Sequence, residues 1–193
     1  MRTRPQTPWK TLRNSLLLRM GGAIAAIALL AVLGMSVSGL VAESTQGSGQ
    51  AINRAGSLRM QGWRMAGYYL ATPLPAGRAE AARMAEAIAT FEDTLTDPAI
   101  LGMLPRASDN LLGIAWQEVL LEWNNHILPR FQAVAEGRAS PPEAADRAAL
   151  VVDMTRFVDH LNRLVKQMEN TTEAKIRVMR MVLGVALLLT VLV

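Results

Sequence analysis

An arginine within a small and apolar helical seam is the residue of this sequence best suited to meet a ligand. The seam repeats at intervals of three and four and consists of Ile52, Gly56, Arg59, Trp63, Ala66 and Leu70. A guanidinium on such a face is costly to desolvate unless something negative meets it. Gly56 precedes Arg59 by one turn, where the missing side chain permits close approach. The pair therefore indicates a site for a small anion.

The same seam predicts how a homodimer would use Arg59. If two copies of the helix face each other, two Arg59 side chains converge near the two-fold axis. At about 6 Å and an effective dielectric near 20, their repulsion is roughly 3 kcal/mol. An anion between them replaces this repulsion by two charge-assisted and potentially bidentate contacts. Anion binding would then act as a switch.

Residue types alone leave a second interpretation of Arg59 open. A lone seam arginine also pairs with an acid on another helix or extends its charged end into water. The acids considered for this pairing are Glu118, Glu122 and Asp159. Arg54 and Arg64 each lie five residues from Arg59, so they project from other faces of a helix. They are interpreted as solvated charges or as partners within the fold.

Other residues that could do chemistry give weak signals. His126 and His160 lack the spacing of metal ligands and are interpreted as solvent-facing or satisfied helix residues. The chain has no cysteine, and we find no phosphate loop, nucleophile–base pair or kinase motif. We therefore expect no metal, no cofactor, no catalytic residue and no enzymatic activity of this chain by itself.

The segment around Arg59 resembles a known family. The residues that carry the likeness are Ala51-Ile52-Asn53, Ala55-Gly56-Ser57-Leu58-Arg59-Met60-Gln61 and Arg64. They resemble the P-box of nitrate/nitrite sensor histidine kinases of the NarX/NarQ type, and residues 51–67 are termed the P-box below. The shorter Ala-Gly-x-x-Arg-Met core also resembles the N-terminal domain of PilJ-type chemoreceptors.

This resemblance implies that Arg59 and Gly56 bind nitrate or nitrite at a homodimer interface. The further P-box positions expected to support the site are Asn53, Ser57, Met60 and Arg64. The sequence departs from the family's usual pattern at Gly62, where serine is common, and at Trp63, where tyrosine is usual. The departures leave the choice between nitrate and nitrite open.

Two apolar segments bracket the middle of the chain. Residues 20–42 carry no charge and are long enough, at about 1.5 Å per residue, to cross a hydrocarbon core of roughly 30 Å. This length favours a transmembrane helix over a cleaved signal peptide. The basic tail of residues 1–19 predicts a cytoplasmic N-terminus. Residues 181–193 are expected to be the start of a second, truncated transmembrane helix.

The segment between these spans, 43–180, has helical periodicity and few strand signals. Breaks are predicted near 71–78, 95–108 and 137–142, with Ser108-Asp109 as a helix cap and Pro129 as a kink or helix end. Because both ends must return to one membrane face, an antiparallel four-helix bundle is the economical arrangement. The predicted fold class is all-α, a periplasmic bundle flanked by two transmembrane helices.

The charge distribution argues against a nucleic-acid partner. The formal net charge is +4 and the sequence pI is near 10.1, but the basic excess lies in residues 1–19, before the first acid, Glu43. The expected partners are the lipid bilayer, a second copy of the chain and a nitrate or nitrite anion.

The expected function is that of a receptor in the bacterial inner membrane with its sensor in the periplasm. By resemblance, a histidine kinase absent from this chain would pass the signal to a response regulator. The signal is expected to leave through the first and last helices by a shift of about 1–2 Å. The alternatives are the ligand-binding half of a type IV pilus-type methyl-accepting chemoreceptor and a structural membrane helical bundle without a ligand.

Overall fold

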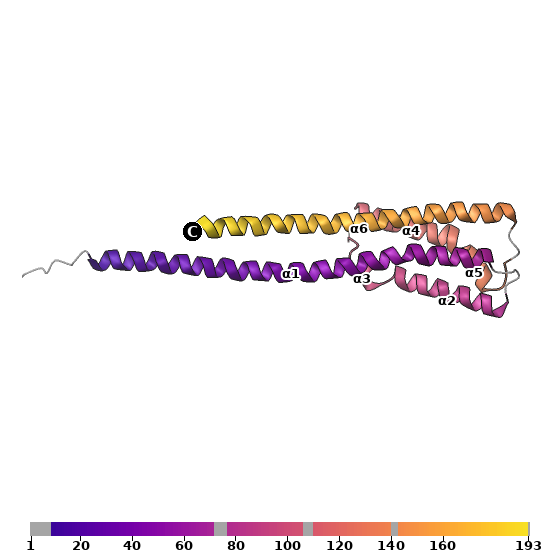
Figure 1. Ribbon diagram of the computed structural model, residues 1–193, viewed down its shortest axis with the longest axis horizontal. Coiled ribbons are helices and arrows are strands. Elements are labelled where there is room, and N and C mark those ends of the chain that lie inside the picture. The colour runs from indigo at the N-terminus through magenta and orange to yellow at the C-terminus, as the bar shows by residue number, and fades with distance from the viewer. Residues whose placement is uncertain (1–8, 72–76, 106–109, 140–142, 193) are drawn as a thin grey trace, which may run out of the picture. The chain divides into compact units, whose positions relative to one another are not determined.

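The computed structural model describes residues 9–71, 77–105, 110–139 and 143–192. The elements in these ranges are all helical and include no strand, which confirms the all-α prediction (Figure 1). They are α1 (Trp9–Ala71), α2 (Arg78–Leu95), α3 (Pro98–Leu101), α4 (Leu111–Glu122), a π-helical turn (Trp123–Ile127), α5 (Leu128–Ala135) and α6 (Ala144–Leu192).

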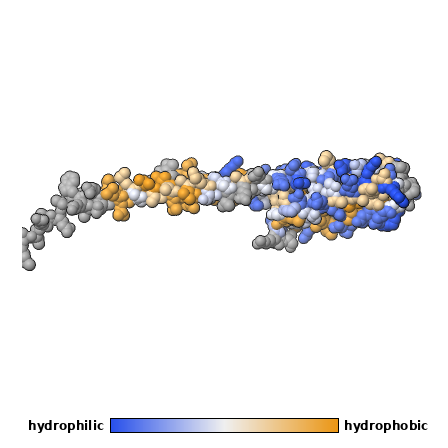
Figure 2. Space-filling model, turned by 90° about the horizontal axis from the view of Figure 1, so that it is seen from below, coloured by the Kyte–Doolittle hydropathy of each residue, from blue (hydrophilic) through white to orange (hydrophobic). Residues whose placement is uncertain are grey.

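The chain divides into two compact units. Unit 2 comprises Thr45–Glu173, and unit 1 takes in the chain up to Ser44 and from Ala174 onward. In unit 1, Leu16–Ser36 of α1 has a mean hydropathy of 2.3 and is the one stretch among the described residues that is long and apolar enough to cross a membrane. It begins before the predicted boundary at residue 20. Figure 2 shows its hydrophobic side chains on the surface of α1.

Exposed apolar side chains also line the end of α6, where the second transmembrane helix was predicted. Met181, Val185 and Leu187 are 66%, 58% and 69% exposed. Within the described residues this stretch does not reach the length and hydropathy that Leu16–Ser36 has. The second span therefore stays a prediction.

Unit 2 is built around one hydrophobic core to which α1, α2, the α4–α5 segment and α6 all contribute. At its centre, Trp123 stacks on Phe91 of α2 with ring centroids 4.2 Å apart, and on Phe157 of α6 at 5.9 Å. The three rings are buried, so they contribute the large apolar area that aromatic side chains bring to a core. This cluster joins three helices far apart in the sequence.

Local signals set the ends of the helices. Asn110 caps α4, since its Oδ1 accepts from the backbone N–H of Leu112 at 2.9 Å. The predicted cap, Ser108-Asp109, was therefore wrong in position, and those two residues lie outside the described ranges. A cap must directly precede the first helical residue for its side chain to reach the first turn. After α5, Gly137 has φ of +67° and ends the helix in a left-handed conformation.

Pro129 does not end the helix, because a π-helical turn before it accommodates the missing backbone N–H. Proline has no N–H to donate to the carbonyl four residues earlier, so an uninterrupted α-helix cannot pass through it. The chain adopts a π-helical turn at Trp123–Ile127 just before it, and the N–H of Leu128 donates to the carbonyl of Trp123. The α4 and α5 helices therefore continue one another.

Candidate functional site

The P-box lies on α1, next to the face that packs into the core. Ala51, Ala55, Leu58 and Met65 are fully buried. Ile52, Gly56 and Arg59 of the predicted seam each follow one of the buried residues directly, so they lie beside the core-facing side of the helix and are only partly buried. Trp63 is 41% exposed. Arg59 therefore occupies a strip between the core and the outer surface of unit 2.

The guanidinium of Arg59 lies over Gly56 and contacts α6. Its Nε donates to the Gly56 carbonyl at 3.2 Å, and its Nη1 donates to Oδ1 of Asn162 at 2.8 Å. Nη2 lies 3.3 Å from the position that a Cβ on residue 56 would take. A side chain at residue 56 would press on the guanidinium, which gives the glycine at this position a physical reason.

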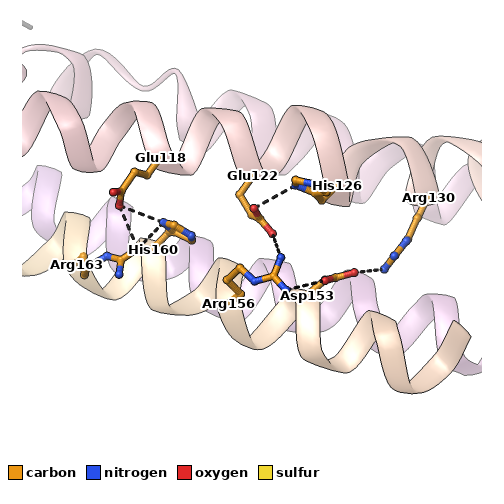
Figure 3. A network of polar contacts seen from close by, with 8 residues as sticks. All are labelled: Glu118, Glu122, His126, Arg130, Asp153, Arg156, His160 and Arg163. Atoms are coloured by element: carbon orange, nitrogen blue, oxygen red, sulfur yellow. Dashed lines mark hydrogen bonds and ion pairs between the residues drawn. The ribbon is translucent and has the colours of Figure 1, made fainter. Parts of the chain in front are cut away.

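The acids proposed as alternative partners of Arg59 have other partners. Glu118 Oε2 lies 3.2 Å from His160 Nδ1 and 3.1 Å from Arg163 Nη2. Glu122, which is 7% exposed, contacts His126 Nδ1 at 3.1 Å and Arg156 Nη1 at 3.4 Å. The network joins Glu118, Glu122, His126 and Arg130 of the α4–α5 segment to Asp153, Arg156, His160 and Arg163 of α6 (Figure 3).

Arg59 does not take part in this network. Arg59 forms no ion pair with Glu118, Glu122, Asp159 or any other acid in the ranges that the structure describes. Its partners there are a backbone carbonyl and a side-chain amide, both neutral. The positive charge on this strip is thus not neutralised by an acid of the described chain. The two histidines are partnered by carboxylates, and no group of metal-ligating residues occurs in the described part of the chain.

The other predicted site residues are dispersed around α1. Ser57 accepts from Gln61 Nε2 at 3.2 Å, and the same nitrogen donates to Thr94 of α2 at 3.1 Å. These contacts fasten α1 to α2, whereas Arg59 contacts α6. Asn53 is exposed, and Met60 is 68% exposed. The structure therefore brings Arg59 and Gly56 together and places Ser57 on the α2 side of α1.

The remaining two P-box arginines have local partners. Arg54 Nε lies 3.4 Å from Asp97 Oδ2, and the guanidinium of Arg64 lies 5.9 Å from the ring centroid of Tyr68. Asp97 also caps α3 by accepting from the N–H of Ala99 at 2.8 Å. Arg54 is thus an ion-pair partner inside unit 2, in agreement with its interpretation from sequence, and Arg64 lies on the exposed surface.

Gly62 marks a close approach of α1 and α6. A Cβ there would lie 3.2 Å from Cε of Met154 and 3.8 Å from Cε1 of Phe157. Gly62, at a position where serine is common in the family that the P-box resembles, thus has a packing role in this chain.

Asn162, the partner of Arg59 on α6, was missed by sequence reasoning, because an asparagine on an exposed helical face carries no signal of its partner.

An apolar helix of membrane length and a helical unit that holds an arginine over a glycine agree with a membrane-bound sensor. Residues 40–147 match the family described as the type IV pili methyl-accepting chemotaxis transducer N-terminal domain, PilJ. The match covers more than half of the chain, including the P-box. The chain belongs to this family and is a sensor input module of a signalling protein.

The chain is also similar to curated nitrate/nitrite sensors. It is 30% identical over 171 residues to the nitrate/nitrite sensor protein NarX of Escherichia coli K12, and equally to those of Escherichia coli O157:H7 and Shigella flexneri. The aligned region is 84% of this chain and 25% of each relative, so the chain spans about a quarter of their length. Both findings confirm the resemblance predicted from the P-box residues.

Proposed function

We propose that this chain is the input module of a homodimeric nitrate/nitrite receptor, with Arg59 and Gly56 as its anion site. The observation that carries the proposal is the guanidinium of Arg59, which lies over Gly56 and faces no acid in the described part of the chain. A permanently charged group that is partly buried without an anionic partner is a site at which a small anion lowers the free energy. The NarX relatives support nitrate or nitrite as that anion.

The geometry of the two groups suits this ligand class. The guanidinium is a planar fork of donors, and nitrate and nitrite are planar acceptors, so an edge of the fork can donate two parallel hydrogen bonds. In a dimer with two-fold symmetry, one anion would accept from Arg59 of both protomers. The exposed Met60 and Trp63 flank this strip on α1, and a second copy of the chain would cover them.

The proposed membrane arrangement follows the sequence boundaries. Residues 1–19 are a cytoplasmic tail, 20–42 the first transmembrane helix, 43–180 an antiparallel four-helix-bundle sensor in the periplasm, and 181–193 the start of the second transmembrane helix. The apolar Leu16–Ser36 stretch supports the first span, and the exposed apolar residues at the end of α6 support the second. The protein would lie in the bacterial inner membrane.

The proposed output is a histidine kinase that acts on a response regulator, as the NarX likeness suggests. The family match to chemotaxis transducers favours a second candidate, in which the same module serves a methyl-accepting chemoreceptor. Motifs encoded downstream in the parent gene would distinguish these two outputs.

The direct test is calorimetric titration of the full chain, reconstituted in lipid nanodiscs, with sodium nitrate against a sodium chloride blank of equal ionic strength. The proposal predicts saturable binding with one nitrate for every two chains. Absence of saturable heat, or one nitrate for every single chain, would contradict the symmetric site.

A further inference from the structure

The guanidinium of Arg59 already donates hydrogen bonds to two partners, with which a bound anion would compete. Of the three guanidinium nitrogens, Nε donates to the Gly56 carbonyl on its own helix and Nη1 donates to Asn162 on α6. Nη2 lies 3.3 Å from the position that a Cβ on residue 56 would take. A planar anion is bound bidentately by two neighbouring nitrogens, either Nε with Nη2 or Nη1 with Nη2. Each of these pairs includes one nitrogen that already donates a bond, Nε through its single N–H and Nη1 through one of its two.

We propose that Asn162 is a positioning residue that holds Arg59 in the anion-free state and is displaced from it when the anion binds. The inference rests on the proposed function of Arg59. The bond to Gly56 is local, three residues away on the same helix, so it can persist while the Nη1 and Nη2 pair turns to an anion. The bond to Asn162 is the one that an anion taking the same N–H of Nη1 would replace.

The chemistry of the two acceptors sets the direction of this exchange. The amide oxygen of Asn162 is a neutral acceptor, whereas a nitrate oxygen carries part of a full negative charge. Charge-assisted bonds from a guanidinium to an anion are stronger than bonds to a neutral acceptor, so the anion displaces the amide. An aspartate at this position would instead pair with Arg59 and compete with the ligand. The asparagine thus orders the guanidinium without neutralising it.

The exchange also links the site to α6. The Arg59–Asn162 bond is directional and joins two helices at residues 103 positions apart in sequence. The neighbouring contact of α1 and α6, at Gly62, is made to the flexible side chain of Met154 and the ring of Phe157, which are apolar and form no directional bond with α1 there. Release of Asn162 by the anion therefore removes a polar restraint on movement of α6 along α1. The anion would act on α6 through this one side chain.

Two substitutions of Asn162 move nitrate affinity in opposite directions on this account. Asn162→Ala removes the competitor and tightens nitrate binding by about fivefold, since a bond to a charged group no longer has to be broken. Asn162→Asp places a carboxylate beside Arg59 and weakens binding by about tenfold. Asn170→Asp is the matched control, because it adds the same charge to an exposed position of α6 about 12 Å further along the helix. Its affinity should stay within about twofold of wild type.

The experiment is nitrate calorimetry of these variants as full chains in nanodiscs, together with a double-mutant cycle on thermal unfolding without nitrate. In the cycle, Arg59→Ala and Asn162→Ala should be non-additive, because each removes the same bond. Opposite changes of affinity for Asn162→Ala and Asn162→Asp, with a non-additive cycle, support the inference. Wild-type nitrate binding that neither substitution alters, or that Asn162→Ala weakens, would overturn it while leaving the anion site intact. Absence of nitrate binding by wild type overturns the proposed function and this inference with it.

Discussion

Nη2 of Arg59 lies 3.3 Å from the point where a Cβ on Gly56 would be placed, so these two residues of α1 share one small volume. The arginine supplies the charge, and the glycine leaves the guanidinium room to lie against the helix. A side chain at residue 56 would therefore change the position of the Arg59 guanidinium.

Substitution of Gly56 tests this relationship without removing the charge. Gly56→Val should abolish nitrate binding, because the added side chain displaces the guanidinium and fills the space proposed for the anion. The helix should remain, since valine is less unfavourable than glycine in a helix interior, by about 0.3 kcal/mol. Gly67→Val is the matched control, because its Cβ would meet nothing within 4 Å. Nitrate calorimetry and circular dichroism of both variants measure the outcome, and equal affinities would contradict the prediction.

Two of the three tryptophans of unit 2, Trp63 and Trp123, should separate folding from dimerisation. Trp123 is 1% exposed and stacks on Phe91, so Trp123→Ala should cost about 3–5 kcal/mol of unfolding free energy. Trp63 is 41% exposed beside Arg59, so Trp63→Ala should change unfolding little and weaken self-association. Thermal unfolding and analytical ultracentrifugation in detergent measure the two effects. A dimer of unchanged affinity in Trp63→Ala would argue against the proposed interface.

The ion-pair network between α4 and α6 predicts a ranking of charge deletions. Arg156 contacts the buried Glu122 at 3.4 Å, and its removal leaves His126 as the remaining partner of that carboxylate in the network. Arg156→Ala should therefore cost about 1.5–3 kcal/mol, the range for a hydrogen bond to a charged group. Lys166→Ala, which removes an exposed pair with Glu169, should cost less than about 1 kcal/mol. Urea unfolding of both variants compares them, and the reverse ranking would count against a structural role for the network.

The orientation in the membrane can be read by cysteine labelling, because the natural chain has no cysteine. Ala145→Cys, at an exposed position in the first turn of α6, should react in intact cells with a reagent that does not cross the inner membrane. Thr3→Cys should be protected until the cells are opened, since the basic tail is expected in the cytoplasm. Labelling of residue 3 together with protection of residue 145 would reverse the proposed topology.

The sequence predicted the elements of this fold better than the contacts between them. Gly137 and the spacing of apolar residues are local signals, so the helical class and the breaks between the long helices could be predicted. The short α3 lies inside the break predicted at 95–108 and was not predicted. The π-helical turn before Pro129 could not, because a proline signals a disturbed helix without specifying how the chain relieves it. The contact of Arg59 with Asn162 depends on the register of α1 against α6, which side-chain packing over the whole core determines.

The measurement that tests the central claim most directly is nitrate calorimetry of wild type, Arg59→Ala and Arg54→Ala in nanodiscs. Arg59→Ala removes a charged contact from both protomers and should cost about 3–6 kcal/mol of binding free energy, which abolishes binding in the millimolar range. Arg54→Ala loses an ion pair with Asp97 and should bind nitrate like wild type. Arg59→Lys should fail nearly as badly as alanine, since an ammonium lacks the planar fork. Nitrate binding by Arg59→Ala with wild-type affinity would contradict the assignment of Arg59 as the anion site.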